Sequence, residues 1–508
     1  MTETLDRAPR RRSAGSSATT DLTDNVDDTE GTGRRRGEAG GRIDTRAKLV
    51  LLVLCAANFL VGIDFSILNI ALPAIGTDLH LGEANLQWVA TAFALPSGGL
   101  LLLLGRTGDL IGRRRVFLAG VALFTAASLL TMLAWNPAAL LAGRALQGLG
   151  AAGVVPTGMA LLTTSFAEGR ARDRALGIAG SLMATGFTVG TLLGGVLTDL
   201  LNWRFTMVLP ILLGVFVLVA TPFLITESRN EHHSRLDVPG AVTVTGGLLA
   251  LIYALTTAAQ QGWGRPNVLS TLIVGVLLLT AFVAIESRSS HALVSLKVLR
   301  RRNVALGNVG GLLAFATGSA TVFIGMLFLQ QVNGLSPLRA GLVFGWLGVI
   351  AAVSGTLAPR VIGRYGSRAV LVVGLLGQGV GIALMAMMTR SDSVLILLVA
   401  GSVCYYGNLH AVVGYNVTAT SGLPNEEQGL ATGLATTTQQ VALTVGIPIM
   451  SAIASTREAG LLRTGHSAAD ALVGGFHLAL WADAAIALVG TALLAAGLLR
   501  RGTADRSA

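Results

Sequence analysis

Two charged side chains lie inside long apolar stretches of this 508-residue chain, and they are the first candidates for chemistry. Asp64 follows Lys48 by 16 residues, which is roughly 24 Å along a helix that rises about 1.5 Å per residue. A carboxylate at such a depth in a bilayer costs about 2.5 kcal/mol or more and is usually kept for a function. Because an apolar environment disfavours a charged carboxyl group, Asp64 is predicted to exchange a proton. The alternative is an aspartate satisfied by a neighbouring helix.

Arg144 lies in the apolar run 138–161, and Gln147 follows it one helical turn later on the same face. A guanidinium group does not release its proton in proteins. Arg144 must therefore act electrostatically, by holding or repelling a nearby carboxylate. An arginine that reaches back to the cytoplasmic headgroups is disfavoured, because this run should cross from outside to inside and 17 of its residues follow Arg144.

Other polar residues in apolar runs are weaker candidates. His410 and Asp483 either relay protons and meet a substrate, or they only make hydrogen bonds between helices; both alternatives stay open. Together with Gln147, Asn416 and Gln439, these two residues are the predicted wall of a cavity.

The elements that must position these side chains are helices in lipid. The chain is 52% hydrophobic and 13% charged, whereas soluble domains carry about 25% charged residues. Fourteen apolar runs approach the length of about 20 residues that a helix needs to cross about 30 Å of hydrocarbon. They are 48–72, 85–104, 115–134, 138–161, 174–199, 205–225, 238–258, 268–285, 304–330, 338–358, 369–389, 393–421, 429–454 and 475–499. We predict an all-α integral membrane protein with 14 transmembrane helices.

The basic residues are distributed unevenly between the two predicted sides of the membrane. With the loops numbered alternately, 30 basic residues fall on the side of the termini and six on the other, and Arg144 lies within a helix. Such a bias marks the cytoplasmic side. We therefore expect a multi-pass protein of the bacterial plasma membrane with both termini in the cytoplasm.

The composition also excludes several classes of function. A net charge of +10 would suggest nucleic-acid binding in a soluble protein, but the basic residues here lie in short loops between apolar runs. The sequence has no Walker loop or dinucleotide fingerprint. Its seven histidines are scattered, and both cysteines lie in apolar runs. We therefore expect no nucleic-acid partner, no enzymatic activity, no cofactor and no metal.

An internal repeat indicates how the helices are grouped. Residues 105–114 resemble residues 359–368, and residues 174–177 resemble residues 428–431. Two related halves with two helices inserted between them account for both matches, and transporters built from repeats bind substrate near the midplane between the halves. The predicted parts are a disordered cytoplasmic tail (1–46), a six-helix bundle (47–227), two linker transmembrane helices (228–303), a second six-helix bundle (304–499) and a cytoplasmic tail (500–508).

The loop after the second apolar run combines glycines with charges. Gly105 and Gly112 permit a tight turn. Asp109 can accept hydrogen bonds at the start of the next helix, where the helix dipole favours an anion. Arg113 can pair with Asp109, and Arg114 adds a second basic residue. The alternative is a basic turn that serves only topology.

Small residues recur at four-residue spacing in the fifth apolar run, and this spacing lets two helices approach closely. They are Gly186, Gly190, Gly194 and Gly195.

These motifs together resemble the major facilitator superfamily, and within it the fourteen-span drug:proton antiporter group, over roughly residues 47–499. Residues 105–115 resemble the cytoplasmic gating motif of the superfamily, from which Thr107, Gly108 and Leu110 depart. The departure at Leu110 puts part of the charge network of that motif in doubt.

Three further segments carry the resemblance. The sequence from Asp64 to Pro73 resembles the signature of the fourteen-span group, and residues 142–150 are similar to the fourth-span motif associated with proton transfer. The glycine-spaced fifth run resembles the antiporter motif of exporters, although Thr191 stands where that motif has proline.

The resemblance implies an antiporter that exports small lipophilic compounds, cationic ones among them, by alternating access. Asp64 and Arg144 would couple export to protons, and the proton gradient would supply the energy. Protons and membrane lipid are the other expected partners, and a monomer is the default of the family. An importer or uniporter on the same fold and a non-transporting membrane sensor are the alternatives.

Overall fold

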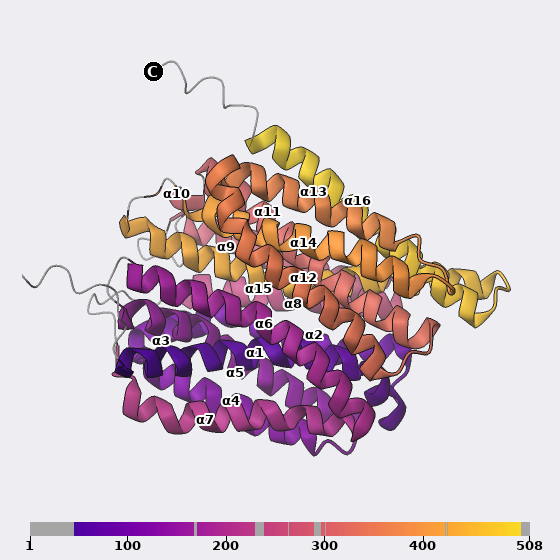
Figure 1. Cartoon of the computed structure of the whole chain (residues 1–508), viewed down its shortest axis with the longest axis horizontal. Helices are drawn as coiled ribbons and strands as arrows, with labels where there is room; N and C mark the ends of the chain where they lie inside the picture. The colour runs from indigo at the N-terminus through magenta and orange to yellow at the C-terminus, as the bar shows by residue number, and fades with distance from the viewer. Residues whose placement is uncertain are drawn as a thin grey trace, which may run out of the picture. The chain divides into compact units, whose positions relative to one another are not determined.

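The computed structural model describes residues 45–166, 170–228, 238–262, 264–288, 296–299, 301–421, 423 and 425–498, and every regular element in them is a helix (Figure 1). The helices are α1 (Thr45–Asp78), α2 (Glu83–Gly99), α3 (Leu101–Ile111), α4 (Arg113–Met132), α5 (Pro137–Ser165), α6 (Arg170–Leu200), η1 (Trp203–Met207), α7 (Val208–Leu224), α8 (Val238–Gln261), α9 (Pro266–Glu286), α10 (Leu296–Leu299), α11 (Arg302–Leu327), η2 (Phe328–Val332), α12 (Pro337–Tyr365), α13 (Ser367–Met385), α14 (Ser393–Thr420), α15 (Asn425–Arg463) and α16 (Ala468–Leu498). Apart from residues 45 and 46, the predicted tails lie outside the described residues.

The all-α prediction is confirmed, and each of the fourteen apolar runs coincides with a long helix or with a helix and its short continuation. Within the described ranges, 11 helices are long and apolar enough to cross a membrane, and the pair α2–α3 makes a twelfth if it is one span. Helices α6 and α15 are not among them, and Thr188–Leu200 of α6 counts as a shorter apolar helix. The count of fourteen spans stays a prediction.

The second span is bent, because α2 and α3 meet at an angle of 45°. Pro96 removes one backbone donor near the end of α2, and Ser97, Gly98 and Gly99 follow it. Prolines and adjacent small residues are the usual causes of helix kinks. The bend directs α3 against α5, and the residues of the predicted gating loop lie on α3 and on the first turn of α4.

The buried apolar side chains form one large cluster at the end of the bundle where α1 ends. This cluster joins Ile67–Ile75 of α1 to Phe323–Leu329 and to Phe344 of α12. At the opposite end, where α1 begins, two separate clusters form. One draws only on residues 50–225 and the other only on residues 314–498. Apolar packing therefore links the two predicted halves mainly at one end.

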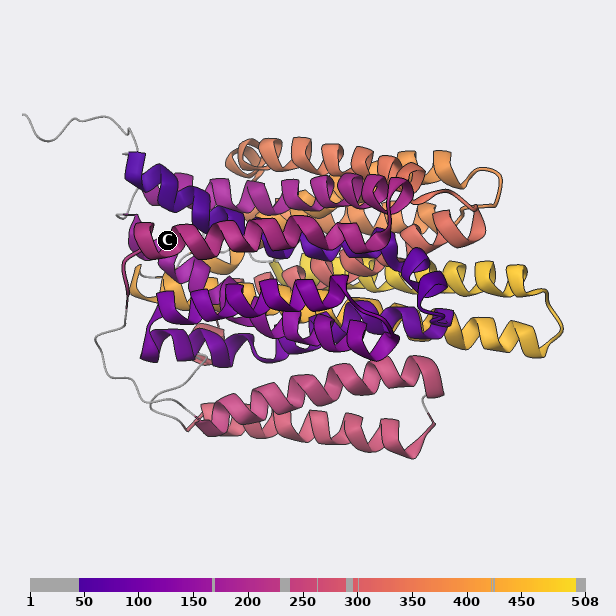
Figure 2. The ribbon, with the colours of Figure 1, turned by 90° about the horizontal axis from the view of Figure 1, so that it is seen from below.

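Helices α8 and α9, which separate the two halves in sequence, form a hairpin beside the other helices (Figure 2). Val244, Leu248 and Ile252 of α8 pack against Leu95 of α2 and Val445 of α15. The hairpin therefore contacts both halves through α8, while most of α9 is exposed and apolar, as expected for a face in contact with lipid.

Candidate functional site

A buried polar network joins three of the predicted site residues. Asp64 on α1 and Arg144 on α5 form an ion pair with 2.6 Å between Oδ2 and Nη1. Gln147, one turn after Arg144, donates from Nε2 to Asp64 Oδ1 at 3.1 Å. All three residues are at most 1% exposed. The structure thus brings together residues that lie 80 positions apart in the chain.

Neighbouring helices hold this network in one arrangement. Arg144 Nε donates to the carbonyl oxygen of Val89 at 3.2 Å, and its guanidinium lies 4.6 Å from the centre of the Phe93 ring. Gln147 Nε2 also donates to Ser128 Oγ on α4 at 2.8 Å. The site is therefore built from α1, α2, α4 and α5, and its cation is stacked on an aromatic face.

The directions of the hydrogen bonds in this network indicate the charge of Asp64. Arg144 Nη1 donates to Gln147 Oε1 at 2.8 Å, and since arginine is only a donor, this contact sets the orientation of the Gln147 amide. The amide nitrogen then faces Asp64, so that both carboxylate oxygens accept from donors. Asp64 is an ionised carboxylate in this arrangement.

The gating-loop residues surround the turn between α3 and α4. Arg113 Nε donates to Asp109 Oδ1 at 2.8 Å, and Arg106 lies 4.0 Å from the other oxygen of Asp109. Gly112 ends α3 with a φ of +122°, a conformation that side chains other than glycine rarely adopt. Gly105 packs on Pro156 of α5.

Glu227 completes this turn, and sequence reasoning did not single it out. Its carboxylate accepts from the backbone N–H of Arg114 at 3.0 Å and lies 3.9 Å from Arg115. The anion at the start of α4 is therefore Glu227, whereas the expectation assigned Asp109 to that position. Asp109 lies in the last turn of α3, before Gly112 reverses the chain. The sequence does place Glu227 in a loop on the same predicted side of the membrane as Arg114 and Arg115, and this was the signal for their contact.

The glycines of α6 mediate close approach to α1. A Cβ added at Gly190 would lie 2.9 Å from the carbonyl oxygen of Ile63, and one at Gly194 would lie 2.8 Å from that of Ile67. Gly186 packs on Phe59, one turn earlier on the same face of α1. Through these three glycines the backbone of α6 lies directly against α1, the helix that carries Asp64. We call this contact the α1–α6 seam.

Helix α6 makes a second close contact, with α12, that the sequence analysis did not identify. Gly195 packs on the Pro337 carbonyl oxygen. On α12, a Cβ at Gly341 would lie 2.9 Å from the Thr191 carbonyl oxygen, and Gly345 and Gly348 pack on side chains of α6. The small-residue spacing of Gly341, Gly345 and Gly348 was the signal in the sequence. Helix α6 therefore links α1 to the second half of the chain.

The remaining predicted residues lie apart from the Asp64 network. His410 Nδ1 of α14 lies 2.6 Å from Ser354 Oγ of α12. Asn416 is exposed on α14, and Gln439 is half-buried on α15. Asp483 is fully buried on α16, and Thr321 Oγ1 of α11 lies 2.9 Å from its Oδ2.

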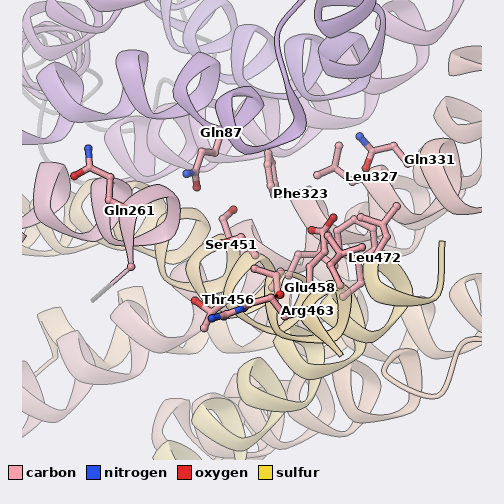
Figure 3. A pocket seen from close by; sticks show the side chains of 17 residues that line it. Gln87, Gln261, Phe323, Leu327, Gln331, Ser451, Thr456, Glu458, Arg463 and Leu472 are labelled. Atoms are coloured by element: carbon pink, nitrogen blue, oxygen red, sulfur yellow. The ribbon is translucent and has the colours of Figure 1, made fainter. Parts of the chain in front are cut away.

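A cavity of about 460 Å³ lies between α2, α11, α15 and α16 and the end of α8 (Figure 3). Phe323 contributes to its apolar wall, and Glu458 and Arg463 contribute one charge of each sign. Gln87 and Ser451 extend into it, and among the described atoms Gln87 Oε1 and Ser451 Oγ have no hydrogen-bond partner. The five residues predicted to line a cavity are not part of this wall.

Among the residues with described positions, no three His, Cys, Asp or Glu side chains are grouped so that they could hold a metal ion. The two cysteines, Cys55 and Cys404, are both buried and unpaired with each other.

Comparison with known proteins identifies relatives over most of the chain. Over 420 residues the chain is 35% identical to the cephamycin export protein CmcT of Amycolatopsis lactamdurans, a match that covers 82% of this chain and 86% of that protein. It is 35% identical over 469 residues to the puromycin resistance protein pur8 of Streptomyces alboniger, with 89% and 91% covered.

Solved structures agree with this relationship at the level of the fold. The structure of an auto-inhibited peptide transporter of the POT family matches with a TM-score of 0.67 at 16% identity, covering 91% of this chain and 98% of that chain. The family model described as Major Facilitator Superfamily matches residues 54–447. The chain, a multi-pass membrane protein with these bacterial relatives, belongs to the Major Facilitator Superfamily.

Proposed function

We propose that this protein is a proton-coupled antiporter that exports small lipophilic compounds across the bacterial cell membrane. The observation that carries the proposal is the fully buried pair of Asp64 and Arg144, in which an ionised carboxylate lies deep in an apolar helix bundle. Buried ionisable residues of this kind mark proton and substrate pathways in membrane proteins. The names of the related proteins, which include antibiotic export and resistance, support the direction of transport.

Proton binding at Asp64 would act on helix packing. A protonated Asp64 no longer neutralises Arg144, and the guanidinium is then buried without a counterion, which is strongly unfavourable. Asp64 lies on α1 and Arg144 on α5, so their separation moves α1. The glycine seam ties α1 to α6, and α6 in turn contacts α12. A proton taken up at Asp64 would thereby change the contact between the two halves.

The distribution of the apolar clusters supports alternating access. With both termini in the cytoplasm, as the basic residues predict, the joint cluster lies at the outer end of the bundle and the two separate clusters lie at the inner end. This arrangement is that of a transporter closed to the outside. Compounds would enter from the cytoplasm or inner leaflet while Asp64 is ionised.

The cavity between α2, α8, α11, α15 and α16 lies at the end of the joint cluster, which shares Phe323, Leu327 and Phe476 with its wall. We therefore place it on the exit path of a lipophilic substrate with hydrogen-bonding groups, because its wall combines aromatic and aliphatic side chains with amides and hydroxyls. The two six-helix bundles would move as units around it. We propose a monomer, since the network, the seam and the cavity all come from one chain. The export cycle needs no chemical conversion and no cofactor, and the proton gradient is its energy source.

The test is the drug susceptibility of an efflux-deficient bacterium that expresses the wild type or Asp64→Asn, with an empty vector beside them. The wild type should protect against part of a panel of antibiotics and dyes, and both Asp64→Asn and an uncoupler should return susceptibility to that of the empty vector. Asp470→Asn is the matched control, because Asp470 forms an exposed pair with Arg390. Export by Asp64→Asn with an unchanged pH dependence would contradict the proposal. Increased accumulation of a compound by the wild type would instead indicate an importer.

A further inference from the structure

A second carboxyl group is buried in the half of the protein that does not contain Asp64. Asp483 is the middle residue of the 31-residue helix α16, and its side chain is 0% exposed. Its Oδ2 lies 2.9 Å from Thr321 Oγ1 on α11. Its Oδ1 is buried and has no hydrogen-bond partner among the described atoms. The surroundings of Asp483 therefore differ from those of Asp64, whose two oxygens both accept from donors.

The two contacts of the Thr321 hydroxyl indicate the protonation state of Asp483. Thr321 Oγ1 lies 2.9 Å from Asp483 Oδ2 and also 2.8 Å from the carbonyl oxygen of Thr317. A hydroxyl has one hydrogen, and the Thr317 carbonyl can only accept. Both contacts are hydrogen bonds at the same time only if Thr321 donates to the Thr317 carbonyl oxygen and accepts from a protonated Asp483. With an ionised Asp483, the single hydrogen of Thr321 serves only one of the two oxygens.

The helices that pack against α16 provide no counterion for an ionised Asp483. The charged residues of α11 and α13 are Arg302 and Arg368, each in the first turn of its helix. The charged residues of α15 lie in its first turn and in its last seven residues, and η2 has none.

We propose that Asp483 is a second proton-binding site of the transport cycle, which holds its proton in the arrangement seen here while Asp64 is ionised. This inference rests on the proposed proton-coupled export. The proton lies on Oδ2 and is donated to Thr321 Oγ1. An ionised Asp483 would leave a charged oxygen without a donor, so the proton can leave only when a change in helix packing admits water to α16. Its release is thereby tied to the conformation of the second half.

Infrared spectroscopy of the full-length protein in lipid vesicles tests the protonation state without any transport. The wild type should show the C=O band of a protonated carboxylic acid at neutral pH, and Asp483→Asn should lack it. Thr321→Val removes the acceptor and should shift the band, whereas Thr321→Ser should restore its position. Thr491→Val is the control, because Thr491 Oγ1 bonds to the carbonyl oxygen of its own helix. A wild type without this band would overturn the assignment.

Proton stoichiometry tests the role in transport. Each coupled proton multiplies the limiting concentration ratio about tenfold per unit of pH difference when the membrane potential is clamped. Asp483→Asn should therefore lower the limiting ratio about tenfold at a gradient of one pH unit, and Thr491→Val should not. An unchanged ratio in Asp483→Asn, with the wild type driven by the gradient, would overturn this inference alone. A wild type that ignores the gradient would overturn the proposed function and the coupling role together.

Discussion

At the scale of single residues, two buried aspartates have opposite surroundings. Asp64 faces a guanidinium and an amide N–H, so that its charge is neutralised and both of its oxygens are satisfied. Asp483 faces one hydroxyl that is already engaged with a backbone carbonyl. The sequence places both at helix positions deep in the bundle and cannot distinguish them, because the difference lies in residues 80 and 162 positions away.

The ion pair at Asp64 predicts a specific pattern of stability. Asp64→Leu leaves Arg144 buried without a counterion and should lower the free energy of unfolding by about 3–5 kcal/mol, since removing one partner of a buried pair has a cost of this size. The double variant Asp64→Leu/Arg144→Met should be more stable than the sum of the two single losses predicts. Thermal unfolding of the purified protein in detergent measures both.

The exposed pair of Arg390 and Asp470 provides the comparison for this stability test. Its side chains are 51% and 62% exposed, and pairs of this kind contribute about 0–1 kcal/mol. Asp470→Asn should therefore leave the unfolding temperature nearly unchanged. Additive losses in the double variant at Asp64 and Arg144 would show that the two side chains do not interact in the folded protein.

At the scale of helices, α6 approaches two neighbours closely. Its glycines bring its backbone against α1, whereas its contact with α12 also involves the side chains of Thr188 and Leu192. Gly194→Ala should destabilise the protein and reduce export, because the added Cβ would lie 2.8 Å from the Ile67 carbonyl oxygen, which cannot move away without displacing α1. The matched control is Gly363→Ala on α12. There, no atom lies within 4 Å of an added Cβ, and replacing a helical glycine by alanine contributes roughly 0.5–1 kcal/mol of stability. Equal unfolding temperatures for the two variants would contradict a tight α1–α6 seam.

The turn between α3 and α4 makes a second prediction at the scale of helices. Glu227→Ala removes the anion that accepts from the Arg114 backbone N–H and lies near Arg115. It should therefore reduce export more than Glu227→Gln, which keeps an acceptor for the N–H group. Transport rates in vesicles, normalised to the amount of protein, give the comparison. Equal rates for wild type and both variants would show that the turn needs only Asp109 and Arg113.

At the scale of the whole helix bundle, the apolar packing is concentrated at the end where α1 ends. The contact of α6 with α12 belongs to that end, since Phe344 and Leu347 of α12 are part of this cluster and Leu197 of α6 packs against it. In this contact, a Cβ at Gly345 would lie 2.9 Å from Leu192 Cγ. The variant Leu192→Cys/Gly345→Cys, made with Cys55 and Cys404 replaced by alanine, should therefore form a disulfide on oxidation. The disulfide would hold the two halves together at this end and stop export. A reductant should break the disulfide and restore export.

Single-cysteine variants control for the substitutions themselves in this experiment. Each should export equally well under oxidising and reducing conditions. Continued export by fully cross-linked protein would show that the contact between α6 and α12 does not open during the cycle, and alternating access at this contact would be wrong.

By itself, the sequence determined that the chain is a bundle of apolar helices, that it belongs to a transporter family and that Asp64 and Arg144 are buried in it. These properties follow from local patterns, because the length of an apolar run and the place of a charge within it are read along one helix. The tertiary structure alone decided that these two residues are partners, that Glu227 rather than Asp109 contacts the start of α4, and that Asp483 faces Thr321. The physical reason is that such contacts depend on the rotation and spacing of helices from distant parts of the chain, which packing determines and no local pattern records.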